Sequence, residues 1–304
     1  MPHLGKTELN VFGLCLGANV FGWTADESQS FAVLDAYAEA GGNFIDTADT
    51  YMRPNMGVSE TIIGRWMAER GNRDDIVLAT KVGSEGGLSA ENIASRVEGS
   101  LQRLQTDRID LYYAHKDDGS VPVAETLRAF DALVRDGKVR HIAASNTTPE
   151  RLRASLELSW REGLAEYVAL QPHYNLVERA GYERDYAPIV AEHDLACLPY
   201  YGLAKGFLTG KYRPGGPAVD SPRASGALAY LDARGERVLA ALDSVATGRA
   251  APVPAVALAW LSAQPGVVAP IASARSVEQL EALLPAVGLK LSDEELAMLT
   301  EASS

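Results

Sequence analysis

The chain has 304 residues, 47% of which are hydrophobic, and a formal net charge of −12. That length and composition can bury a large core. The negative charge repels phosphate backbones, so nucleic acid is not expected as a partner. No apolar run approaches the length that spans a bilayer, and the N-terminal segment lacks the apolar stretch of a signal peptide. Neither a membrane partner nor secretion is therefore expected.

The chain contains two cysteines, Cys15 and Cys197, and both lie in apolar stretches. Two such residues do not make a disulfide framework, and their surroundings predict buried, inert thiols. A reducing, cytoplasmic location fits this pattern.

Short apolar runs alternate with segments of helical period along the whole chain. In the helical pattern at 59–71, Ser59 is expected to be the N-cap and Gly71 to end the helix. A small hairpin is predicted at 3–11. A helical pattern follows each of the eight predicted strands, which lie at 14–17, 43–48, 76–82, 110–115, 138–146, 167–175, 196–202 and 267–273.

Strand–helix alternation indicates parallel strands with right-handed crossovers, and eight units is the number in a TIM barrel. The sequence therefore predicts an α/β fold. We expect residues 1–304 to form a single (β/α)8 TIM-barrel catalytic domain with an N-terminal β-hairpin and extra C-terminal helices. A doubly wound sheet that binds a dinucleotide would need G-x-G-x-x-G after its first strand, which is absent. The Pro-, Gly- and Ser-rich stretch 213–226 follows the seventh strand and is interpreted as a lid.

Polar residues stand at the carboxyl ends of three neighbouring predicted strands. Asp46 ends the second strand and Tyr51 follows it, Lys81 ends the third, and His115 ends the fourth. In a barrel these ends meet at one mouth, so the four side chains are expected to converge there. Asp49 lies between the first two and is expected only to stabilise the loop.

These four side chains suit a general acid aimed at a carbonyl oxygen. An isolated tyrosine is a weak acid, and the ammonium of Lys81 is expected to lower the pKa of Tyr51. Asp46 would keep a buried Lys81 protonated. His115 can orient a substrate oxygen or relay a proton. Protonating a carbonyl oxygen is useful only if the carbon is attacked, and a hydride from a nicotinamide would complete the reaction.

A set of motifs along the chain resembles those of the aldo-keto reductases. The set consists of FIDTADTY, LATK, DLYYAH, GKVRHIAASN, LQPHYN, PYYGLAKGFLTGKY and PIASAR. It is most similar to the bacterial branch related to potassium channel β subunits. The resemblance implies a TIM barrel that binds NADPH without a Rossmann motif. It also implies reduction of a small aldehyde or ketone to an alcohol, with Tyr51 as proton donor and Asp46, Lys81 and His115 as its catalytic partners.

The resemblance further implies where the ligands bind. Trp23, Tyr51 and His115 would contact the substrate. The nicotinamide carboxamide would meet Ser145, Asn146 and Gln171, and Tyr200 would stack on its ring. The whole implied cofactor set is Ser145, Asn146, Gln171, Tyr200, Tyr201, Gly202, Leu203, Ala204, Gly206, Leu208, Lys211, Arg213, Ile271, Ala272, Ser273, Arg275 and Gln279.

Several positions depart from the family pattern. Tyr201 and Gly202 replace a frequent Ser-Pro, which alters the floor of the pocket. Ser273 and Ala143 replace common glycines. Leu283 stands where an asparagine often contacts adenine. The charge of Arg275 favours NADPH over NADH, because a guanidinium suits a 2′-phosphate.

Two other functions remain open. Lys81 suits a Schiff-base lyase, since lysines at barrel strand ends perform that chemistry. The second alternative is a regulatory protein, in which the barrel senses NADP(H) and turns over slowly. A metal site is not expected, because the adjacent acids Asp117 and Asp118 are typical of a solvated loop.

Overall fold

The structure is a computed structural model that describes residues 1–52 and 55–304. Its centre is an eight-stranded parallel sheet with the order β7-β6-β5-β4-β3-β2-β1-β8, so strands that follow one another in the chain are neighbours. The strands are β1 Cys15–Gly17, β2 Phe44–Asp46, β3 Val77–Val82, β4 Ile109–Ala114, β5 Val139–Ser145, β6 Tyr167–Gln171, β7 Ala196–Cys197 and β8 Ile271–Ala272.

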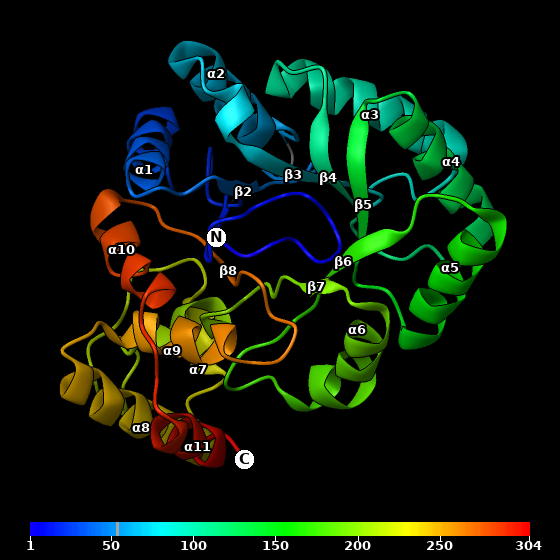
Figure 1. Cartoon of the computed structure of the whole chain (residues 1–304). Helices are drawn as coiled ribbons and strands as arrows, with labels where there is room; N and C mark the ends of the chain where they lie inside the picture. The colour runs from blue at the N-terminus through cyan, green and yellow to red at the C-terminus, as the bar shows by residue number, and fades with distance from the viewer. Residues whose placement is uncertain (53–54) are drawn as a thin grey trace.

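The sheet curls on itself, and helices surround it in a TIM-barrel-like arrangement (Figure 1). Its two ends approach each other, because the backbone N–H of Ile271 donates to the carbonyl of Pro199 at 2.9 Å. The α/β class predicted from the sequence is confirmed. The helices that follow the strands are α1 Glu27–Glu39, α2 Val58–Arg70, α3 Ala90–Leu104, α4 Val123–Arg135, α5 Pro149–Glu162, α6 Ala187–His193, α9 Val253–Ser262 and α10 Val277–Glu281.

Three further helices lie outside this repeat: α7 Ala224–Leu228, α8 Ala233–Arg249 and α11 Asp293–Ala302. The extra C-terminal helix α11 was expected, and it begins with a capping box at Ser292. Helix α8 was not expected, because the segment after β7 was interpreted as a long insertion. No helix among residues 1–52 and 55–304 combines the length and apolar character needed to cross a bilayer.

The start of α2 differs from the prediction. The helix begins at Val58, with Gly57 at the N-cap in the left-handed region. Ser59 is instead buried within the first turn, and its hydroxyl donates to the carbonyl of Ala18 at 2.8 Å. The expected end is confirmed, because Gly71 adopts a φ of 62° at the C-cap.

The predicted N-terminal hairpin is present and lies across the centre of the ring of strands (Figure 1). Its side chains Leu4, Leu9 and Val11 are buried in one apolar cluster with residues from inside the sheet, including Phe44 and Leu111. The hairpin therefore closes the N-terminal end of the barrel, and it leaves the C-terminal end for ligands.

Candidate active site

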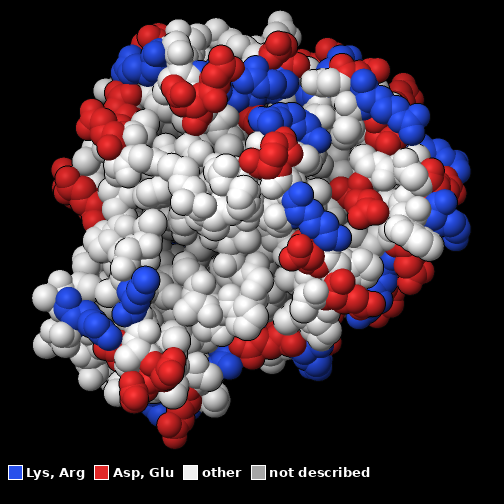
Figure 2. Space-filling view, viewed as in Figure 1, with Lys and Arg blue, Asp and Glu red and all other residues white. Residues whose placement is uncertain are grey.

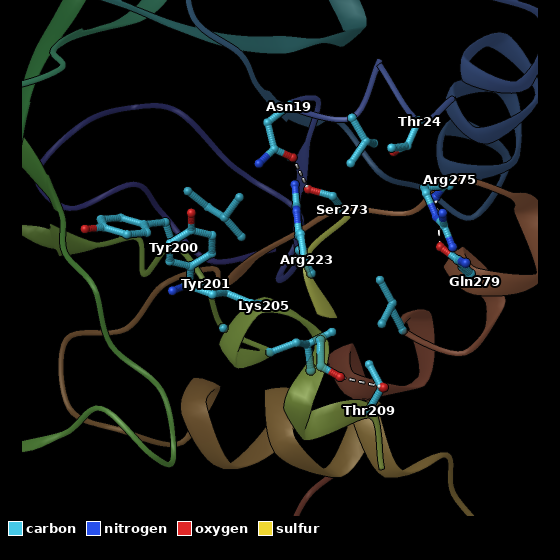
Figure 3. A pocket seen from close by; sticks show the side chains of 18 of the residues that line it. Asn19, Thr24, Tyr200, Tyr201, Lys205, Thr209, Arg223, Ser273, Arg275 and Gln279 are labelled. Carbon is cyan, nitrogen blue, oxygen red and sulfur yellow. Dashed lines mark hydrogen bonds between the residues drawn. The ribbon is translucent and has the colours of Figure 1, made fainter. Parts of the chain in front are cut away.

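A cavity of about 670 Å³ opens at the carboxyl ends of the strands. It extends from Tyr51 and His115 to Arg275 and Gln279, and Figure 3 shows much of its wall. The loop after β1, the segment after β7 and the start of α10 all contribute to it. This is the face on which barrel enzymes build their sites.

Lys81 lies at the centre of the polar groups below this cavity. Successive residues of β3 face opposite sides of the sheet, so Lys81 points into the barrel. Its ammonium donates to Asp46 Oδ2 at 2.6 Å, to the carbonyl of Thr47 at 2.7 Å and to the hydroxyl of Tyr51 at 3.2 Å. Burial alone lowers the pKa of Lys81, but Asp46 and Tyr51 outweigh it and raise that pKa above its ordinary value. Lys81 is therefore charged at neutral pH.

Two opposing effects act on the pKa of the Tyr51 phenol. Burial raises the pKa of its phenol, and the charge of Lys81 opposes that rise only in part. Lys81 lowers the pKa of Tyr51, as predicted, but burial outweighs this effect, so the net pKa lies above that of a free tyrosine. At neutral pH Tyr51 remains a phenol that holds its proton, next to an ammonium that would stabilise the phenolate.

A hydrogen-bonded chain extends from Asp46 across the mouth. The side chain of Gln171 donates to Asp46 Oδ1 at 2.9 Å, and the hydroxyl of Ser145 donates to the carbonyl of Gln171 at 2.9 Å. Asn146 donates to that hydroxyl at 3.0 Å. The hydroxyl of Tyr200 then donates to Asn146 Oδ1 at 2.9 Å. Residues from β2, β5, β6 and the segment after β7 are thus fixed relative to one another.

His115 lies on the other side of Tyr51. The two rings are edge-to-face with their centroids 6.0 Å apart, and both line the cavity. The backbone carbonyl of His115 accepts a hydrogen bond from the Asn146 side chain at 2.8 Å. The polar network of the mouth therefore fixes the backbone of His115, and its imidazole lies edge-to-face with the phenol of Tyr51.

The cavity is positively charged although the chain as a whole is acidic. Its wall contains Lys205, Lys211, Arg223 and Arg275, and Asp46 is the one acidic residue among the described residues that line it. None of the four cations forms an ion pair with a carboxylate in the described part of the chain. Burial first, and then the neighbouring cations, lower the pKa of Lys211. Clustered cations without carboxylate partners fit a ligand that carries several phosphates.

Most residues implied as binding residues line this cavity. The set is Trp23, Tyr51, His115, Asn146, Gln171, Tyr200, Tyr201, Gly202, Leu203, Gly206, Lys211, Ile271, Ala272, Ser273, Arg275 and Gln279. Lys81 and Ser145 lie directly behind the wall, within the network described above. Ala204 and Leu208 are buried in the core beneath it. Arg213 points elsewhere, because its guanidinium binds Asp243 at 2.7 Å.

The structure adds lining residues that sequence reasoning missed, among them Asn19, Thr24, Lys205, Thr209, Arg223 and Ala282. Asn19 accepts a hydrogen bond from the hydroxyl of Ser273 at 2.7 Å (Figure 3). Arg223 lies over the ring of Trp23, with its guanidinium carbon 5.5 Å from the ring centroid. Arg223 belongs to the stretch 213–226 that was interpreted as a lid, so the place of that stretch after the seventh strand was the available signal.

Residues 13–304 match the family model described as the aldo/keto reductase family. The chain belongs to the aldo/keto reductase family. Family membership makes it an oxidoreductase, and nicotinamide dinucleotides are the cofactors used in this family. The expected resemblance is confirmed over nearly the whole chain.

Relatives in this family are named for different functions. Norsolorinic acid reductase B of Aspergillus parasiticus is 35% identical over 95% of this chain and 80% of its own length. An uncharacterized oxidoreductase of Bacillus subtilis, YrpG, is 36% identical over 98% of this chain and 94% of its own. A probable voltage-gated potassium channel subunit beta of Oryza sativa subsp. japonica is 32% identical over 91% of this chain and 88% of its own.

Proposed function

We propose that this aldo/keto reductase uses NADPH to reduce an aldehyde or ketone to an alcohol, with Tyr51 as the proton donor. One observation supports this above the others. The hydroxyl of Tyr51 lies 3.2 Å from the ammonium of Lys81, at the surface of a cavity whose other end contains Arg275. We also take residues 1–304 to form a single (β/α)8 TIM-barrel catalytic domain.

The roles of the side chains follow from their contacts. Tyr51, protonated at neutral pH, gives its proton to the carbonyl oxygen of the substrate. Lys81 stabilises the phenolate that remains, and Asp46 keeps Lys81 charged. His115, edge-on to Tyr51, orients the carbonyl oxygen. The buried position of this group excludes water and strengthens each electrostatic contact.

The cavity fits the cofactor by its chemistry. When bound, the reduced nicotinamide supplies the hydride that the carbonyl carbon receives. Asn146 and Gln171 offer amide groups for the carboxamide, and Tyr200 offers its ring for stacking. Lys211 offers positive charge for the pyrophosphate. Arg275 suits a 2′-phosphate, and on this basis we propose NADPH rather than NADH.

The test is a reduction assay with a panel of aromatic aldehydes and ketones, followed by NADPH absorbance. Aromatic substrates are chosen because Trp23, Tyr200 and Tyr201 line the cavity and because one relative is named as a reductase of norsolorinic acid. Oxidation of NADPH with formation of the alcohol is expected. Titration calorimetry measures binding of NADPH independently. Absence of both binding and oxidation would overturn the proposal.

Two alternatives make different predictions. The relative named as a potassium channel subunit favours a slow NADP(H)-sensing protein, in which NADPH would bind tightly and turn over far more slowly than metabolism requires. A Schiff-base lyase is disfavoured, because Lys81 is fully buried and lies behind the cavity wall. Borohydride trapping of a carbonyl compound on Lys81 would support the lyase.

A further inference from the structure

The end of the cavity farthest from Tyr51 has an unusual wall. Gln279 of α10 lines it, with Ala282 and Leu283 from the turn between α10 and the short helix Leu284–Val287, and with Arg275, which precedes the N-cap Ser276 of α10. Figure 3 shows Arg275 and Gln279 side by side at this end of the site. Any ligand that reaches this end is therefore in contact with α10 and the residues that flank it.

That wall offers few hydrogen-bond acceptors. Ala282 and Leu283 have none in their side chains, and Leu283 is only 4% exposed within an apolar cluster. The side-chain oxygen of Gln279 already accepts a hydrogen bond from the backbone N–H of Arg275 at 3.0 Å. Its amide NH2 is left to donate, and only one further lone pair of its oxygen can accept. Thr209, from a different element, donates its hydroxyl to the carbonyl of Gly206 at 2.8 Å, and the oxygen of that hydroxyl can still accept.

The proposed function determines which part of the ligand meets this wall, and the present inference rests on it. If Arg275 binds the 2′-phosphate, the purine base lies next to it, because both are attached to neighbouring carbons of the same ribose. Adenine carries a 6-amino group, which is a donor and requires an acceptor to be recognised. Hypoxanthine carries an oxygen at the same position, which accepts.

We propose that the wall formed by Ala282 and Leu283 holds the base by apolar packing and does not read its 6-amino group. Selection of the dinucleotide then depends on the phosphate contacts of Arg275. Gln279 donates to whichever acceptor the base presents. This chain therefore accepts a hypoxanthine dinucleotide in place of an adenine one, and Leu283 is the residue that removes the discrimination.

Calorimetric titration with NADPH and with its reduced hypoxanthine analogue tests this on the unmodified protein. The two dissociation constants are expected to agree within about threefold. A site that hydrogen-bonds the 6-amino group would bind NADPH about tenfold more tightly or better, because the analogue would leave an acceptor unpaired. That result would overturn this inference alone. Failure of both dinucleotides to bind would overturn the proposed function as well.

The variant Leu283→Asn tests whether Leu283 is the residue that makes the two dissociation constants similar. Asparagine adds an acceptor to the wall, so the ratio of the two dissociation constants is expected to rise to about tenfold in favour of NADPH. Leu283→Met is the matched control, because it keeps the volume and adds no comparable acceptor, and its ratio should stay near one. Both ligands are measured on the same variant, so a loss of stability does not change the ratio. An unchanged ratio in Leu283→Asn would overturn the role given to Leu283.

Discussion

Two groups of buried charges flank strand β3, and only one of them reaches the cavity. The inner cluster comprises Asp46, Tyr51, Lys81 and Gln171, inside the barrel. The outer cluster comprises Asp49, Glu60, Arg96 and Arg103, with contacts to the opposite face of β3. Adjacent residues of β3 supply them, because Lys81 points inward while Thr80 donates to Glu60 at 2.6 Å.

The two clusters satisfy their charges differently. In the inner cluster each oxygen of Asp46 accepts a short hydrogen bond. In the outer cluster Glu60 is fully buried and binds Arg103 at 2.7 Å. Asp49 has only a long ion pair with Arg96, at 3.7 Å, and neither of its oxygens accepts a hydrogen bond within the described part of the chain.

We expect the inner cluster to serve catalysis and the outer cluster to serve stability. A buried ion pair alone is weak evidence of a catalytic or a stabilising role, because its desolvation cost offsets much of its attraction. What distinguishes the inner cluster is a titratable proton donor, Tyr51, at the cavity surface. The outer cluster joins strands to α2 and α3 and has no member on the cavity wall. Variants of the inner cluster should therefore change rate, and variants of the outer cluster should change the free energy of unfolding.

The largest effect is expected for Tyr51→Phe. Removing the proton donor should lower the kcat of carbonyl reduction by about 10²–10⁴-fold, while the Kd for NADPH changes little. The assay is NADPH oxidation, with calorimetry for binding. Tyr112→Phe is the matched control, because Tyr112 lies on the neighbouring strand β4, is buried and its hydroxyl forms no hydrogen bond with the described residues. Equal rates for both variants would contradict the role of Tyr51.

The next effect concerns the outer cluster. Glu60→Gln keeps the shape of the side chain and removes the charge that pairs with Arg103. The free energy of unfolding should fall by about 3 kcal/mol, at the low end for a broken buried pair because Arg103 is 30% exposed. Urea unfolding measures this. The kcat of folded protein should stay within about twofold, and a large fall in kcat with unchanged stability would contradict a purely structural role of Glu60.

The smallest effect is expected for Asp49→Asn, and it has the opposite sign. Burial, with the charge of Glu60, raises the pKa of Asp49 to about 6. The folded state then binds this proton more tightly than the unfolded state, so the contribution of Asp49 to stability falls as pH rises from about 4 to 6. Asparagine removes that penalty and should stabilise the protein by about 1–3 kcal/mol above pH 6, with no gain near pH 4.

Urea unfolding at pH 3.5 and pH 8 checks the pH dependence. Asp107→Asn serves as the control, because Asp107 is 87% exposed and its removal should change stability by under about 0.5 kcal/mol at either pH. Equal effects of Asp49→Asn at both values would show that the buried carboxylate is not the source of the change.

The periodic parts of the chain were predictable. Hydrophobic alternation predicted the hairpin and eight strand–helix units, and the strand ends predicted that Asp46, Lys81 and Tyr51 would meet. The carboxyl ends of the barrel strands meet at one mouth, so polar residues at these ends can be placed together before the fold is known. The outer cluster was not foreseen, because Glu60 lies within an ordinary helical pattern and its partner Arg103 is 43 residues away.

The direction of the pKa shift of a buried group was not predictable where two effects oppose each other. The sequence shows that Lys81 and Tyr51 meet, but whether burial or charge determines the pKa of Tyr51 depends on exposure, which only the structure supplies. Positions on irregular backbone were also missed. Arg213 and Arg223 lie in the same Pro- and Gly-rich stretch, and nothing in their spacing shows that Asp243 holds the first while the second lies over Trp23.

The N-terminal hairpin also constrains the order of events at the site. Gly5, with a φ of 55°, lets the turn approach the carbonyl of Val168, and Leu4 fills the floor of the barrel. Ligands must then reach and leave Tyr51 through the C-terminal mouth. Two ligands that share one opening cannot exchange independently, so the deeper one has to enter first and leave last. For the proposed reaction, the hairpin thereby favours ordered sequential kinetics.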